Sequence, residues 1–138
     1  ALSLATIVLV AAHGLLLIGD SWLNPGLSGI AIPFTMDYRP FWTGLGTIAG
    51  YGLMILGLSY YARKWIGPAR WRLAHRFIAV FWILGIFHTF GAGTDAGELW
   101  LQIPVAITTV PALILLGMRL GTKPAAKPAK PRRAPQRA

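Results

Sequence analysis

Three histidines are the side chains of this sequence best suited to chemistry: His13, His75 and His88. All three lie inside long apolar runs, where an ionisable residue is by default a candidate functional group. A neutral imidazole binds a metal through one ring nitrogen and donates a hydrogen bond through the other. The simpler alternative for each is a neutral imidazole that is hydrogen-bonded to a neighbouring helix. Which of the two holds depends on how the histidines lie relative to one another.

Other kinds of reactive site are excluded or weakly supported. The chain contains no cysteine, which excludes disulfides, thiolate-ligated metals and iron–sulfur clusters. No Ser-His-Asp grouping, phosphate loop or GxGxxG fingerprint occurs, and the chain has no room for a flavin or nicotinamide domain. Three dispersed histidines with no carboxylate in the apolar runs also make a poor site for zinc or copper without haem.

Four apolar segments must position these histidines, and each qualifies as a bilayer-crossing helix. About 20 mainly apolar residues are needed, because roughly 30 Å of hydrocarbon is crossed at about 1.5 Å per residue. The mean hydropathy is +0.58, and only 12% of residues are charged. The predicted helices are about 2–18, 41–62, 71–90 and 99–118. We expect an all-α fold, an integral membrane bundle of four transmembrane helices, with residues 21–40 forming an interfacial or re-entrant stretch.

Basic and acidic residues separate onto two sides of this predicted bundle. The bases of the second connection and the following helix start are Arg63, Lys64, Arg70, Arg72 and Arg76. The other two connections hold all the acids against one base, Arg39: Asp20, Asp37, Asp95 and Glu98. The positive-inside rule then places both termini in the cytoplasm of a multi-pass protein, expected in a bacterial inner membrane. The net charge of +9 favours an anionic membrane surface over nucleic acid, because the bases flank apolar runs.

The C-terminal residues 121–138 form a separate region from the domain at residues 1–120. Six of the 13 bases lie in the last sixteen residues, alternating with Pro and Ala. Proline cannot continue a helix and this composition cannot bury a core, so we expect a disordered basic tail. The tail either tethers the chain to lipid or to a cytoplasmic partner, or is a solvated segment that only sets the topology.

His13 and His88 are expected at similar depth. The first and third predicted helices run in the same direction, His13 lies about two-thirds of the way along the first, and His88 lies in the outer half of the third. Their imidazoles are therefore able to face each other. Two neutral imidazoles from two helices are what the iron of a bis-histidine haem requires.

His75 is harder to interpret. Thirteen residues separate it from His88, or about 19.5 Å along a helix axis, which would place two metal centres in separate leaflets. The same spacing leaves the two imidazoles roughly 140° apart around an ideal helix, unless tilt, a π-bulge or haems on different sides absorb the difference. His75 also lacks a partner at its depth. Either that partner belongs to an upstream segment, as the absence of an initiator Met suggests, or His75 is not an axial ligand.

The chain resembles the ferric reductase-like transmembrane domain family over about residues 1–120. The matching features are Ala-His-Gly around His13, Pro33-Phe34, Tyr38-Arg39-Pro40-Phe41-Trp42, Arg63, Trp71-Arg72-Leu73-Ala74-His75-Arg76, and His88 with Ala92-Gly93-Thr94-Asp95. This family includes the haem-binding membrane subunit of the bacterial methionine sulfoxide reductase system and, more distantly, the membrane part of NADPH oxidases.

The resemblance implies ligands for haem b. His13 and His88 would be the axial ligands of an outer haem, and His75 would serve an inner one, giving one haem or, in a full-length chain, two. Family members usually carry a further His about fourteen residues before the position of His13, and one or two preceding helices. Arg39 would pair with haem propionates outside, and Arg72 and Arg76 inside, although simple snorkelling to the interface also accounts for each base.

We therefore expect a membrane electron-transfer component, the haem-binding part of an oxidoreductase. It would pass electrons across the lipid bilayer from a cytoplasmic reductase or quinol to an outer-side redox partner. The alternative is a non-haem helical membrane protein, a small transporter or a scaffold subunit that uses histidine as a proton relay. Pro104 and Pro111 in the fourth helix favour a transporter if they break it. A structural four-helix unit without a site is the third interpretation.

Overall fold

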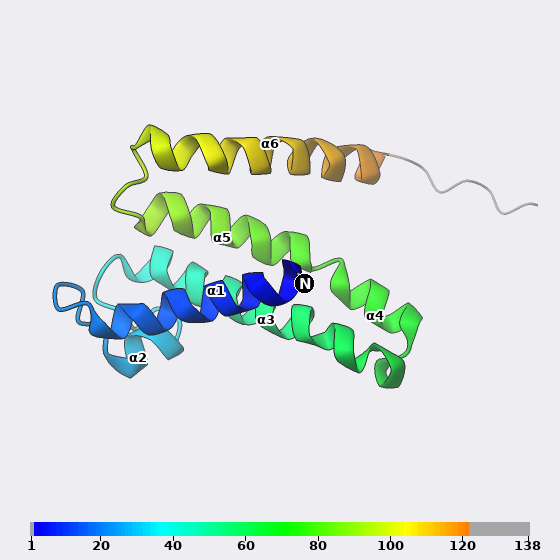
Figure 1. Cartoon of the computed structure of the whole chain (residues 1–138), viewed down its shortest axis with the longest axis horizontal. Helices are drawn as coiled ribbons and strands as arrows, with labels where there is room; N and C mark the ends of the chain where they lie inside the picture. The colour runs from blue at the N-terminus through cyan, green and yellow to red at the C-terminus, as the bar shows by residue number, and fades with distance from the viewer. Residues whose placement is uncertain (1, 122–138) are drawn as a thin grey trace, which may run out of the picture. The chain divides into compact units, whose positions relative to one another are not determined.

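The computed structural model describes residues 2–121, and every regular element in that range is a helix (Figure 1). The expected disordered tail lies outside the described residues from position 122 onward. The chain divides into two compact units, residues 1–98 and residues 99–138.

Three helical runs in the described residues are long and apolar enough to cross a membrane. They are α3 (Pro40–Ile66), the run Pro68–Ala92 that contains α4 (Pro68–His75) and α5 (Ile78–Ala92), and α6 (Leu99–Gly121). The first predicted span is shorter: α1 (Leu2–Leu16) continues into the 3₁₀ turn η1 (Leu17–Gly19). Residues 2–121 thus fold into helices alone, three of them long and apolar enough to cross a membrane and one shorter, which is the pattern of a membrane protein.

The central helix of the first unit is α3, which packs against α1 and α5 (Figure 1). It begins at Pro40 in the first helical position, directly after Arg39 in a left-handed conformation (φ 43°). It ends at Gly67, whose φ of 90° suits glycine alone, with Arg63 and Lys64 in the last turn near the negative end of the helix dipole. The helix therefore continues beyond the predicted end at residue 62 as far as Gly67, which is followed by Pro68.

The predicted third helix is divided. Between α4 and α5 the N–H groups of Arg76, Phe77, Ala79 and Val80 donate to carbonyls three residues earlier, at 3.0–3.4 Å. Such 3₁₀ winding turns about 120° per residue instead of 100°. Overwinding at Arg76 and Phe77 therefore changes the angle between His75 and His88 from the value of an ideal helix. An overwound turn, and no π-bulge, lies between the two histidines.

The segment between η1 and α3 is irregular except for one short helix, α2 (Gly26–Ala31). Asp20 begins it with a side-chain oxygen that accepts hydrogen bonds from the N–H groups of Trp22 and Leu23 at 2.9 and 3.0 Å. The Tyr51 hydroxyl of α3 donates to the carbonyl of Ala31 at 2.6 Å. These bonds hold an irregular chain against the end of the bundle.

Small residues allow close packing in the first unit. A Cβ atom built on Gly52 of α3 would overlap the Phe81 ring of α5. The buried apolar residues are few (Met36, Ala49 and Ala92), whereas large apolar side chains are widely exposed, for example Leu9 at 69% and Leu16 at 77%. Without a water-driven core, membrane helices associate through small residues and close packing, as here.

The second unit is described through α6 alone, which runs unbroken from Leu99 to Gly121 although it contains Pro104 and Pro111. The Thr108 hydroxyl donates to the carbonyls of Pro104 and Val105 at 2.9 and 3.0 Å. This is the ordinary bond of a helical threonine to the carbonyls of its preceding turn. The carbonyls that the two prolines leave without a backbone N–H donor are those of Trp100 and Ile107.

Candidate functional site

The structure brings His13 and His88 together. His13 is in the last turn of α1 and His88 is near the end of α5, and their ring centroids lie 6.2 Å apart with an angle of 74° between the ring planes. Both helices carry their histidine toward the end of the unit where α2 lies (Figure 1). Two segments distant in sequence therefore present their imidazoles to each other.

One backbone contact fixes the orientation of His88. Its Nδ1 lies 2.9 Å from the carbonyl oxygen of Trp42 in the first turn of α3. A carbonyl only accepts hydrogen bonds, so Nδ1 must carry the proton and Nε2 keeps the free lone pair. A second bond of this kind on the non-ligating nitrogen is the usual support of a metal-binding histidine.

Two glycines make room for this arrangement. A Cβ atom on Gly46 would overlap the His88 ring, and one on Gly91 would overlap the Trp42 ring. Gly46 lies one turn after Trp42 on α3, and Gly91 lies one turn after His88 on α5. Each glycine thus admits the ring of the opposite helix, which brings the Trp42 carbonyl to His88.

The spacing of the two rings fits one iron between them. A metal–nitrogen bond of about 2.0 Å and a distance of about 1.1 Å from nitrogen to ring centroid predict centroids about 6 Å apart across a shared metal. The His13 side chain is exposed, and its ring makes no hydrogen bond with residues 2–121, so its ring nitrogens are open to an external ligand. No group of three or more His, Cys, Asp or Glu side chains gathers in the described residues. The pair suits a metal whose other ligands come with it, as the iron of haem does.

Arg39 lies at the same end of the unit. Its Nη1 donates a hydrogen bond of 2.7 Å to the carbonyl of Gly91, and its guanidinium lies 5.3 Å from the Tyr38 ring centroid. The side chain is exposed and keeps further N–H donors beyond the one used at Gly91. Arg39 thus joins the start of α3 to the end of α5, one turn beyond His88.

His75, Arg72 and Arg76 are not part of this pair. His75 is on α4 and stacks on Trp71, with ring centroids 4.7 Å apart and an angle of 23°. Trp71 in turn donates from Nε1 to the Ser59 hydroxyl at 3.1 Å. The Nδ1 atom of His75 is buried without a hydrogen-bond partner in the described part of the chain, and no second histidine faces it there.

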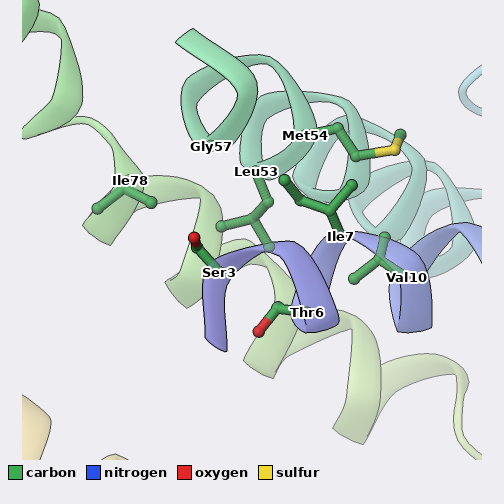
Figure 2. Close-up of a pocket in the computed structure, with 8 residues that line it drawn as sticks. All are labelled: Ser3, Thr6, Ile7, Val10, Leu53, Met54, Gly57 and Ile78. Carbon is green, nitrogen blue, oxygen red and sulfur yellow. The ribbon is translucent and has the colours of Figure 1, made fainter. Parts of the chain in front are cut away.

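An apolar cavity of about 130 Å³ lies between α1, α3 and the first residue of α5 (Figure 2). Its only polar lining groups are the hydroxyls of Ser3 and Thr6, and Val10 brings it within one turn of His13 on α1. No histidine lines it. The cavity therefore borders the histidine pair without belonging to it.

Sequence reasoning found the two histidines but missed Trp42, Gly46 and Gly91. Trp42 acts through its carbonyl, a group that every residue possesses, so its residue type does not predict this contact. The glycines are predictable in principle, because small residues that recur in an apolar helix mark close contacts between helices. Comparisons of the chain with protein-family models, with characterised proteins and with solved structures found no match.

Proposed function

We propose that this chain is a membrane b-type haem protein in which His13 and His88 are the two axial ligands of one haem. The observation that carries the proposal is the pair of facing imidazoles with centroids 6.2 Å apart, one of them held by a backbone carbonyl. When bound, haem supplies one-electron chemistry, for which the protein sets position and electrostatic surroundings.

The surrounding residues have defined tasks in this proposal. The Trp42 carbonyl holds Nδ1–H of His88 and so presents Nε2 to the metal. Arg39 places a positive charge one turn beyond His88, where it would offset the negative charge of a propionate.

The proposed role is electron transfer across the bilayer, with α1 as a fourth, short span. The bases Arg63, Lys64 and Arg70 at one end of the first unit face the cytoplasm, and the acids at the other end face outward. Both termini would then be cytoplasmic in a bacterial inner membrane. The donor would be a cytoplasmic reductase or quinol, the acceptor an outer-side redox partner, and the chain one component of an oxidoreductase of the ferric reductase-like family.

The transporter alternative has less support. It requires broken helices at matching positions, but α6 is continuous through Pro104 and Pro111. The break at Arg76 and Phe77 has no counterpart in the other described helices.

Difference spectra of two variants test the proposal. In reduced-minus-oxidised spectra of the purified chain, we expect the absorption of a low-spin b-type haem. His13→Ala and His88→Ala should each remove that signal or convert it to high-spin, because each removes one axial ligand of the same iron. His75→Ala, which leaves the pair intact, is the matched control. A wild-type chain without haem, or a low-spin signal that survives either substitution, refutes the assignment.

A further inference from the structure

The exposed side of α4 combines two arginines with two large apolar side chains. Arg72 and Arg76 lie one helical turn apart, and Leu73 and Phe77 lie beside them on the same half of the helical run. All four are exposed, Leu73 at 60% and Phe77 at 58%. The opposite half, which carries Trp71, packs against α3. This surface is called the α4 outer face below.

The two guanidinium groups are free of protein partners. Neither Arg72 nor Arg76 makes a side-chain hydrogen bond or ion pair with any residue in 2–121. No acidic residue occurs between positions 38 and 94 of the sequence, so this part of the chain has none to offer. Planar guanidinium groups bind phosphate oxygens through two parallel N–H bonds. An anion that comes from outside the chain is therefore the matching ligand.

The apolar half of the α4 outer face decides what kind of anion fits. If an acidic soluble protein bound the two guanidinium groups, Leu73 and Phe77 would stay exposed to water, which is unfavourable for large apolar side chains. The nearby end of α3 exposes Tyr60, Tyr61 and Trp65, the residue types that lie at the boundary between hydrocarbon and headgroups. A phosphate next to hydrocarbon, as in a phospholipid, matches both halves of the face.

We propose that the α4 outer face is a binding site for an anionic phospholipid. Arg72 and Arg76 bind the phosphate, and the acyl chains lie along Leu73 and Phe77. A headgroup of net negative charge is preferred over a zwitterionic one, because two unneutralised cations face it. The site is independent of the haem proposal and gives the two arginines a ligand other than a propionate.

Native mass spectrometry of the full chain in detergent tests the site with two probe lipids, phosphatidylglycerol and phosphatidylcholine. We expect the wild type to retain phosphatidylglycerol in preference to phosphatidylcholine. Arg72→Gln with Arg76→Gln should weaken phosphatidylglycerol binding by about 25-fold, at roughly fivefold for each base near an anionic lipid. Lys64→Gln with Arg70→Gln is the charge-matched control, because it removes the same net charge from neighbouring positions.

The competing explanations give different results. If attraction is spread over all bases, the two double variants lose equal affinity and the proposal is overturned. If the ligand is free phosphate, an excess of inorganic phosphate displaces the lipid, whereas the proposal predicts no displacement. Leu73→Asn should weaken retention of both lipids, since the acyl contact is shared. Circular dichroism and a monodisperse elution profile establish that each variant is folded, so unchanged lipid retention in the Arg72/Arg76 variant also refutes the site.

Discussion

Replacing Gly46 by alanine should damage the histidine pair without touching either histidine. A Cβ atom at this position would lie 2.6 Å from Cγ of the His88 ring, whereas ordinary van der Waals contact begins at 3.4 Å. The ring must therefore move away from α3 by at least about 0.8 Å, or α3 and α5 must separate. Alanine is otherwise a favourable helix residue, so no loss of helix stability is expected to obscure the effect.

The shift acts on the bond that orients His88. The Nδ1 atom lies 2.9 Å from the Trp42 carbonyl, and a movement of that size along the bond would lengthen it to about 3.7 Å, beyond hydrogen-bond range. Loss of such a supporting bond typically lowers metal affinity by about 10- to 100-fold. We therefore expect Gly46→Ala to lower haem affinity by that factor and to increase the high-spin fraction.

The assay is haem titration of the purified apoprotein, followed by optical absorption. Gly85→Ala is the matched control, because Gly85 lies one turn from His88 on α5 and a Cβ atom there meets nothing within 4 Å. It should bind haem as the wild type does. Wild-type affinity and a low-spin spectrum in Gly46→Ala would mean that the contact of His88 with α3 does not support the site, and the reasoning would fail.

Two further predictions concern topology and His75. Because the chain has no cysteine, single cysteines can be added directly: one at Ala69 should be shielded from an impermeant thiol reagent in intact cells, and one at Ser28 should react. The reverse labelling would invert the proposed orientation. His75→Ala should leave the haem content of the 138-residue chain at one per protein, because His75 stacks on Trp71 and faces no second histidine in the described residues. A halved haem content would show that His75 ligates a second haem.

The meeting of His13 with His88 could be expected from sequence because helical rise converts residue number into depth. Two histidines at the same depth on helices that run in the same direction can contact each other if the helices are neighbours. The orientation of the rings could not be obtained in this way. It depends on the Trp42 carbonyl and on the missing side chain of Gly46, neither of which belongs to a residue type with chemistry of its own.

Helix boundaries were predictable where the sequence carries a stop residue. Gly67 followed by Pro68 ends α3, and this pair predicts a helix end beyond residue 62. The overwound turn at Arg76 and Phe77 had no such signal, because neither residue disfavours an α-helix. The first apolar run was predicted as one helix to Ile18, and the structure differs there only in winding, because residues 17–19 form a 3₁₀ turn.

The electron paramagnetic resonance spectrum of the ferric protein tests the proposed ligation most directly. Two imidazoles on one iron produce a low-spin signal, and its shape reports the angle between their planes. Near-perpendicular planes leave two iron orbitals almost degenerate and give a highly anisotropic signal with one large g value. The 74° angle between His13 and His88 predicts this signal, with one haem per chain. A high-spin signal, or a chain that binds no haem, would contradict ligation by this pair.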